Sequence, residues 1–123
     1  MRSPGLALAA LLALAAASAA RGQDLAHGEA VFLSRCQMCH ALDGPGQGPD
    51  LKGVVGRKAG GAADFNYSDP MSRSGLTWTP EILDRFLAAP SRMVPGSPMQ
   101  AMVPDPAERR DLIAYLASLK GSP

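Results

Sequence analysis

The sequence lacks an excess of charge of either sign, long hydrophobic runs after its first twenty residues, and thiols outside one short motif. From residue 21 onward, eleven basic and eleven acidic side chains cancel, so no basic surface for nucleic acid and no charged tail is indicated. No later segment is apolar enough to cross a membrane. The 123 residues suffice for one domain but not for two.

The first twenty residues differ from the rest of the chain. Arg2 gives a positive start, the apolar run LALAALLALAAA follows, and the small residues ASAA match a signal-peptidase site. The run is shorter than the ~20 residues that span a bilayer, which disfavours the alternative of an uncleaved anchor. We predict a signal peptide over residues 1–20, cleaved near residues 19–21, and one exported domain over residues 21–123.

Helix signals occur at both ends of the domain, and a loop-rich middle separates them. Asp24 is a plausible N-cap for a helix reaching residue 36, whose apolar face includes Leu25 and Phe32. Thr79 and Asp105 are each followed by proline, which suits the first position of a helix. Glycine and proline recur through residues 44–71, and five prolines mark residues 90–106 as extended or turning. Without a βαβ pattern, the domain is predicted to be all-α with large loops.

The two cysteines and one of the two histidines lie together in the motif CQMCH, residues 36–40. Such a pair can form a redox disulfide, part of a zinc site or a haem attachment site. Zinc needs four ligands, and joint ligation by the adjacent Cys39 and His40 is awkward. Haem attachment explains all three residues, because Cys36 and Cys39 would form thioethers with the vinyl groups and His40 would ligate the iron. We therefore favour one covalent haem c, with a plain disulfide as the alternative.

The sixth position of the iron can be taken by a methionine, by a second histidine, or by water or substrate. His27 lies in the first predicted helix with no evident partner for its second ring nitrogen, and we interpret it as a solvated residue. Met38 is confined to the attachment loop. The proline-stiffened stretch VPGSPMQAM offers Met99 and Met102, and both are possible on chemistry alone.

These pieces, in their order, resemble the class I cytochromes c, in particular the mitochondrial cytochrome c and bacterial cytochrome c2 group. The similar segments are GEAVFLSRCQMCH, GPDLKGVVGRKAG, FNYSDPM, GLTW, FLAAP, VPGSPM and RRDLIAYLASL, which span about residues 28–120. The resemblance implies an all-α cytochrome c fold, with crossing terminal helices and large loops wrapped round one covalently attached haem. It also implies that the terminal helices meet at Gly28, Phe32, Leu112 and Tyr115.

The resemblance assigns roles to individual residues. Met99 matches the axial methionine of the family, and the Pro49 carbonyl matches the acceptor of the proximal imidazole N–H of His40. Three further donors match neighbours of the haem propionates: Arg57, Tyr67 and Trp78. Three positions depart from the mitochondrial pattern: Phe86 where a tyrosine is usual, Pro98 where a lysine is usual, and Met71 where a polar residue is usual.

An iron ligated on both faces has no open site, so we predict an electron carrier rather than an enzyme. The implied partners are a quinol–cytochrome c reductase-type complex, a terminal oxidase or a photosynthetic reaction centre, served by a monomer in a bacterial periplasm. Arg35, Arg92 and Lys52 match positions near the haem edge, although the neutral total charge predicts weak electrostatic steering. The alternatives are a dedicated partner of one exported dehydrogenase, and a peroxidase-type enzyme that loses Met99.

Overall fold

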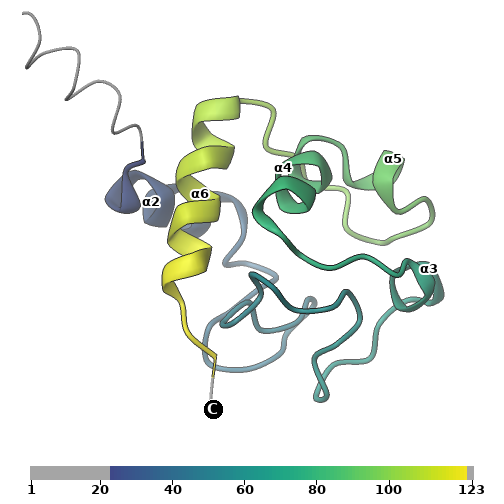
Figure 1. Ribbon diagram of the computed structural model, residues 1–123. Helices are drawn as coiled ribbons and strands as arrows, with labels where there is room; N and C mark the ends of the chain where they lie inside the picture. Colours follow the sequence, from purple (N-terminus) through teal and green to yellow (C-terminus); the bar gives the residue numbers. More distant parts are fainter. Residues whose placement is uncertain (1–22, 122–123) are drawn as a thin grey trace, which may run out of the picture.

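The computed structural model describes residues 23–121, so the predicted signal peptide lies outside the described residues. The helices are α2 (Leu25–Arg35), α3 (Asp69–Arg73), α4 (Pro80–Ala88), α5 (Pro90–Met93) and α6 (Pro106–Ser118) (Figure 1). The only β pairing in this part of the chain is an isolated bridge between Lys58 and Thr77. The predicted all-α class is confirmed. Within residues 23–121, no helix is both long and apolar enough to span a bilayer.

The three longer helices begin where the sequence predicts. Asp24, Thr79 and Asp105 precede α2, α4 and α6, and each side chain accepts a hydrogen bond from a backbone N–H of the first turn. Pro80 and Pro106 occupy the first helical positions, where the missing N–H has no intrahelical partner to lose. These caps fix the starting points of the helices that carry most of the core.

Two short helices lie in stretches that were predicted to be loop or extended chain. Helix α3 follows Ser68, whose hydroxyl oxygen accepts the N–H of Met71 at 3.4 Å. Helix α5 starts at Pro90, directly after the C-cap of α4. Helices of four and five residues complete little more than one turn, so they leave no apolar periodicity in the sequence.

Helices α2 and α6 cross at one side of the molecule (Figure 1). Gly28 makes the crossing possible, because a Cβ there would overlap the backbone of Asp111 and contact the Cβ of Tyr115. Phe32 and Leu112 are fully buried at the crossing, and the rings of Phe32 and Tyr115 lie 5.6 Å apart. The implied crossing of the terminal helices is thus confirmed.

The exposure of two residues of these helices is unusual for their residue types. Leu25, predicted on the buried face of α2, is 53% exposed, because it occupies the first turn, beyond the crossing. Asp111 on α6 is buried, with only 3% of its surface exposed.

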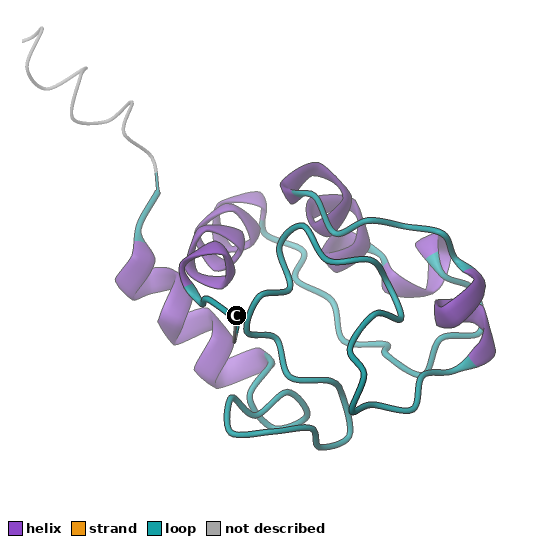
Figure 2. Ribbon diagram, turned by 60° about the horizontal axis from the view of Figure 1, so that its bottom comes forward, coloured by secondary structure: helices purple, strands orange, loops and turns teal. Residues whose placement is uncertain are grey.

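The long loops close the other side of the molecule (Figure 2), and the core continues through buried residues of α4 such as Leu83 and Phe86.

Candidate functional site

The helices and long loops enclose a cavity of about 350 Å³, a size in the range typical of cofactor sites, ~300–1,000 Å³. Its lining is mostly apolar and comes from the end of α2, from α3, α4 and α6, and from the loops between them. All eight predicted site residues line this one cavity: Cys36, Cys39, His40, Pro49, Arg57, Tyr67, Trp78 and Met99. The cavity therefore brings together Cys36 and Met99, which lie 63 positions apart in the sequence.

His40 is held in a defined orientation by the loop that follows the CQMCH motif. Its Nδ1 lies 2.9 Å from the carbonyl oxygen of Pro49, so Nδ1 carries the proton and donates it. The Nε2 lone pair is then available to a metal ion, and the hydrogen bond makes the imidazole a stronger ligand. Gly48 packs against the ring so closely that a Cβ there would overlap it. The tautomer and the ring position are thus both set by the chain itself.

The two cysteines differ in their surroundings. Burial among apolar side chains raises the pKa of the Cys36 thiol to about 11, although the neighbouring Arg35 acts in the opposite direction. The Cys39 Sγ lies 3.4 Å from the side-chain oxygen of Gln47. The nucleophilic cysteine of a redox pair normally has a lowered pKa, so that it is a thiolate at neutral pH. The raised pKa of Cys36 is the opposite and disfavours a redox disulfide.

The zinc interpretation also lacks a set of ligands. Among residues 23–121, the His, Cys, Asp and Glu side chains form no cluster of three or more that could hold a metal ion. A structural zinc site needs four such ligands in a tetrahedral arrangement.

The side chain of Arg57 shows what kind of group the cavity suits. Its terminal nitrogens donate to the carbonyl oxygens of Asp50 at 3.1 Å and Lys52 at 3.4 Å. Its Nε is buried and has no hydrogen-bond partner in the described part of the chain. Tyr67 accepts the N–H of Ala62 at 3.0 Å, which leaves its hydroxyl proton free to donate. Both residues line the cavity, so they are candidates to donate to a carboxylate-bearing group there, and the haem propionates are such groups.

The remaining wall of the cavity is rich in thioether and aromatic groups. Met71, Met99 and Met102 all line it, but Met102 is 53% exposed, whereas Met99 packs against the hydrophobic core. Phe86 is 5% exposed and its ring lies 4.8 Å from that of Trp78. This wall offers soft sulfur ligands and apolar surface, as a flat, largely apolar cofactor requires.

His27 does not line the cavity, and its partner was missed in the sequence. Its Nδ1 lies 2.7 Å from a carboxylate oxygen of Asp111, and the ring is 43% exposed. The hydrogen bond to Asp111 raises the pKa of His27, and partial burial opposes the shift. The two residues lie 84 positions apart, and a single sequence contains no signal that pairs them.

Asp111 accepts three hydrogen bonds, two of them from residues at the start of α2. Burial by itself raises the pKa of this carboxyl, but donors from Arg110, from His27 and from the backbone N–H of Asp24 outweigh it. The pKa is lowered to about 2. The carboxylate therefore stays charged at every physiological pH, and it attaches the first turn of α2 to α6.

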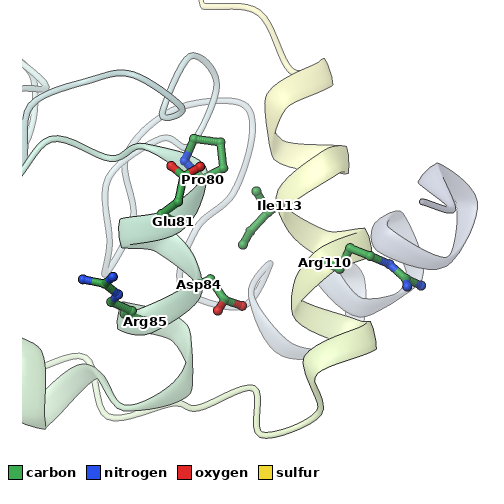
Figure 3. A pocket seen from close by; sticks show the side chains of 6 residues that line it. All are labelled: Pro80, Glu81, Asp84, Arg85, Arg110 and Ile113. Carbon is green, nitrogen blue, oxygen red and sulfur yellow. The ribbon is translucent and has the colours of Figure 1, made fainter. Parts of the chain in front are cut away.

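A second hollow, of about 420 Å³, lies on the surface between α4 and α6 (Figure 3). It is more open than the first, and four of its six lining residues are charged: Glu81, Asp84, Arg85 and Arg110, with Pro80 and Ile113 completing it. None of the predicted site residues belongs to it.

The geometry of the first cavity defines a c-type haem site: a Cys-x-x-Cys-His motif, an oriented imidazole, thioether groups and unsatisfied donors around one apolar space. Comparison with known proteins agrees. The family model described as Cytochrome c matches residues 25–120. The chain belongs to the cytochrome c family.

Among curated relatives, a cytochrome c2 from Agrobacterium tumefaciens is 48% identical over 101 residues, covering 76% of this chain and 89% of that protein. A cytochrome c2 from Rhodomicrobium vannielii is 40% identical over 125 residues and covers 98% of this chain and 99% of that protein. Among solved structures, cytochrome cH from Methylobacterium extorquens matches with a TM-score of 0.74 at 45% identity, over 77% of this chain and 98% of that one.

Membership of this family settles the general character of the protein. It carries one covalently attached haem c, and it is an electron-transfer protein rather than an enzyme. The predicted cofactor is therefore confirmed.

Proposed function

We propose that this protein is a soluble, exported cytochrome that shuttles single electrons between membrane complexes in a bacterial periplasm, with His40 and Met99 as the axial ligands of its haem. The observation that carries the proposal is the convergence of the CQMCH motif and Met99 on one cavity. Cys36 and Cys39 are its attachment points. When bound, the haem supplies an iron that cycles between ferrous and ferric states.

The chain's own residues explain why such an iron would transfer electrons without reacting further. Pro49 holds His40 with Nε2 free for ligation, and Met99 offers a thioether, a ligand that raises the reduction potential. With His40 and Met99 both as ligands, the iron would keep no open position for a substrate. Arg57 and Tyr67 supply donors for the propionates, whose charge would otherwise be costly to bury.

The proposed partners are those that the resemblance to the class I cytochromes c implies: a quinol–cytochrome c reductase-type complex as donor, and a terminal oxidase or photosynthetic reaction centre as acceptor. Carriers of this kind make brief contacts that bury little surface, often below ~1,200 Å². The hydrophobic run at residues 1–20 supports export as a signal peptide.

The experiment that tests the ligation is a comparison of Met99→Ala with Met102→Ala in protein matured with its haem. Ferric haem with a methionine ligand has a weak charge-transfer band at the red end of the spectrum, so Met99→Ala should abolish the band and Met102→Ala should keep it. The reverse result would assign the ligand to Met102. A colourless protein after maturation in a host competent for haem attachment would refute the proposal as a whole.

A further inference from the structure

The chain around Met99 has little regular support of its own. We call residues 94–105, between α5 and α6, the methionine segment. Within it, no backbone-to-backbone hydrogen bond involves residues 98–102 in the described structure. Met99 donates its N–H only to the nearby hydroxyl of Ser97, at 3.4 Å. Segments with so few hydrogen bonds open more readily than the helices around them, unless something else fastens their ends.

The C-terminal end of the methionine segment is fastened to α4 by its backbone. Val103 donates its N–H to the carbonyl oxygen of Leu87 at 2.8 Å, and its side chain is 3% exposed. The adjacent Pro104 has no N–H, so only carbonyl oxygens remain for further attachment at this point.

Arg109 of α6 binds those carbonyl oxygens. One terminal nitrogen of its guanidinium donates to Val103 at 2.9 Å and to Pro104 at 2.8 Å. Its Nε donates to a carboxylate oxygen of Asp84 at 2.8 Å, and the side chain is only 12% exposed. Asp84 projects from α4 toward α6 (Figure 3). A single side chain thus joins α4, α6 and the methionine segment.

The planar guanidinium suits this position. It carries five N–H donors in a fixed geometry and stays charged at every accessible pH, so it can hold two consecutive peptide carbonyls and a carboxylate together. Hydrogen bonds from a charged donor are stronger than neutral ones. Lysine has a single nitrogen and cannot reproduce the arrangement.

We propose that Arg109 is a positioning residue for the sixth iron ligand: by clamping Val103 and Pro104 to α4 and α6, it keeps Met99 at the haem cavity. The inference rests on the proposed function, because it takes Met99 as the ligand. Arg109 itself does not line the cavity and touches no reacting atom. Without the clamp, the methionine segment opens more often and Met99 leaves the iron more often.

Binding of added imidazole to the ferric protein measures this opening. Imidazole can reach the iron only when Met99 has left, so its apparent affinity scales with the fraction of open molecules. Loss of hydrogen bonds to a charged donor changes such an equilibrium by about tenfold or more. Arg109→Gln should therefore bind imidazole about tenfold more tightly than the unmodified holoprotein, and Arg109→Lys should fall between the two.

A second readout does not depend on the iron. Hydrogen exchange of the Val103 amide in the reduced holoprotein should accelerate in Arg109→Gln, whereas amides at the crossing of α2 and α6 should keep their rates. Arg85→Gln is the matched control, since it also removes one arginine charge, from an exposed position on α4. It should leave both imidazole affinity and Val103 exchange unchanged.

The outcomes separate the clamp from a general effect on stability. If Arg109→Gln accelerates exchange equally throughout the protein, or matches Arg85→Gln in both measurements, the positioning role is refuted. Should Arg109→Gln fail to fold, Asp84→Asn offers a milder test, because it leaves the carbonyl bonds but frees the guanidinium to move; an unchanged imidazole affinity would then count against the clamp. If unmodified protein and Met99→Ala bind imidazole equally, the ligand assignment fails instead, and Val103 exchange still tests the clamp.

Discussion

At the scale of single residues, the chemistry of the haem site is set by a few side chains whose types are unambiguous in the sequence. The CQMCH motif indicates covalent haem because no other use of two thiols and an adjacent imidazole accounts for all three residues. The structure adds the orientation of His40 by Pro49 and the unpaired Nε of Arg57. Hydrogen-bond geometry of this kind depends on loops that meet only in three dimensions.

Phe86 is the residue at which a single added atom should alter the haem. Its ring is buried in the cavity wall against Trp78. With Met99 as the proposed iron ligand, a Phe86→Tyr hydroxyl that donates toward its sulfur would draw electron density from the iron and stabilise the ferrous state, so the midpoint potential should rise. A redox titration measures the change. Phe65→Tyr, at a half-buried position beside Tyr67, is the matched control and should leave the potential nearly unchanged; equal potentials in Phe86→Tyr and unmodified protein would contradict the prediction.

At the scale of elements, the long helices were predictable and the short ones were not. Asp24, Thr79 and Asp105 mark helix starts through local hydrogen bonds that the sequence determines by itself. Helices α3 and α5 have only five and four residues, too few to leave a periodic pattern in the sequence. Burial of Asp111 could not be foreseen either, because a carboxylate is normally exposed and its partners come from the other end of the chain.

The crossing of α2 and α6 should be intolerant of any side chain at Gly28. A Cβ there would overlap backbone atoms of Asp111, which cannot move without shifting the helix. Overpacking of this kind costs about 3 kcal/mol or more, which outweighs the gain of ~1 kcal/mol in helix propensity from glycine to alanine. Urea unfolding of the holoprotein measures the loss in Gly28→Ala. Glu29→Ala, on the exposed face of the same helix, should change stability by less than about 0.5 kcal/mol.

The attachment of α2 to α6 through His27 and Asp111 should make stability depend on pH. The pKa of His27 is raised above 6.5, mainly by its hydrogen bond to Asp111, with smaller contributions from Asp24 and Glu108. Its contribution to stability is therefore complete below about pH 6.5 and disappears as pH rises through the raised pKa. The pKa of Asp111 is lowered from 3.8 to about 2, so its contribution is lost only as pH falls below 3.8.

His27→Gln should consequently destabilise the protein most at about pH 5, where the histidine is charged and Asp111 is ionised, and less at about pH 9. Urea unfolding at the two pH values measures the difference. Glu29→Gln, a charge change elsewhere on α2, should show no comparable pH dependence. A His27→Gln effect that is equal at both pH values would mean that the ring acts by packing rather than by charge.

At the scale of the whole molecule, charge is balanced locally as well as in total. Among the described residues that line the cavity, the arginines are Arg35 and Arg57; Arg35 lies 3.2 Å from Glu108, and Lys52 lies 3.7 Å from Asp50. The neutral sum can be counted from the sequence, but the pairing of Arg35 with Glu108 of α6 cannot, because the two residues meet only in the folded protein. Arg35 and Lys52 consequently present little uncompensated positive charge to an acidic partner.

Association with a membrane partner should therefore respond weakly to salt. Electrostatic steering typically raises association rates by roughly tenfold or more, and the effect disappears as screening increases. With purified quinol–cytochrome c reductase, the second-order rate of electron transfer to this protein should fall by much less than tenfold between about 10 mM and about 200 mM salt. Glu108→Gln frees the charge of Arg35 beside the cavity, and its rate should fall more steeply over the same range. If the unmodified protein has as steep a response as Glu108→Gln, the local pairing of charges does not govern docking, and cations farther from the cavity must steer the partner.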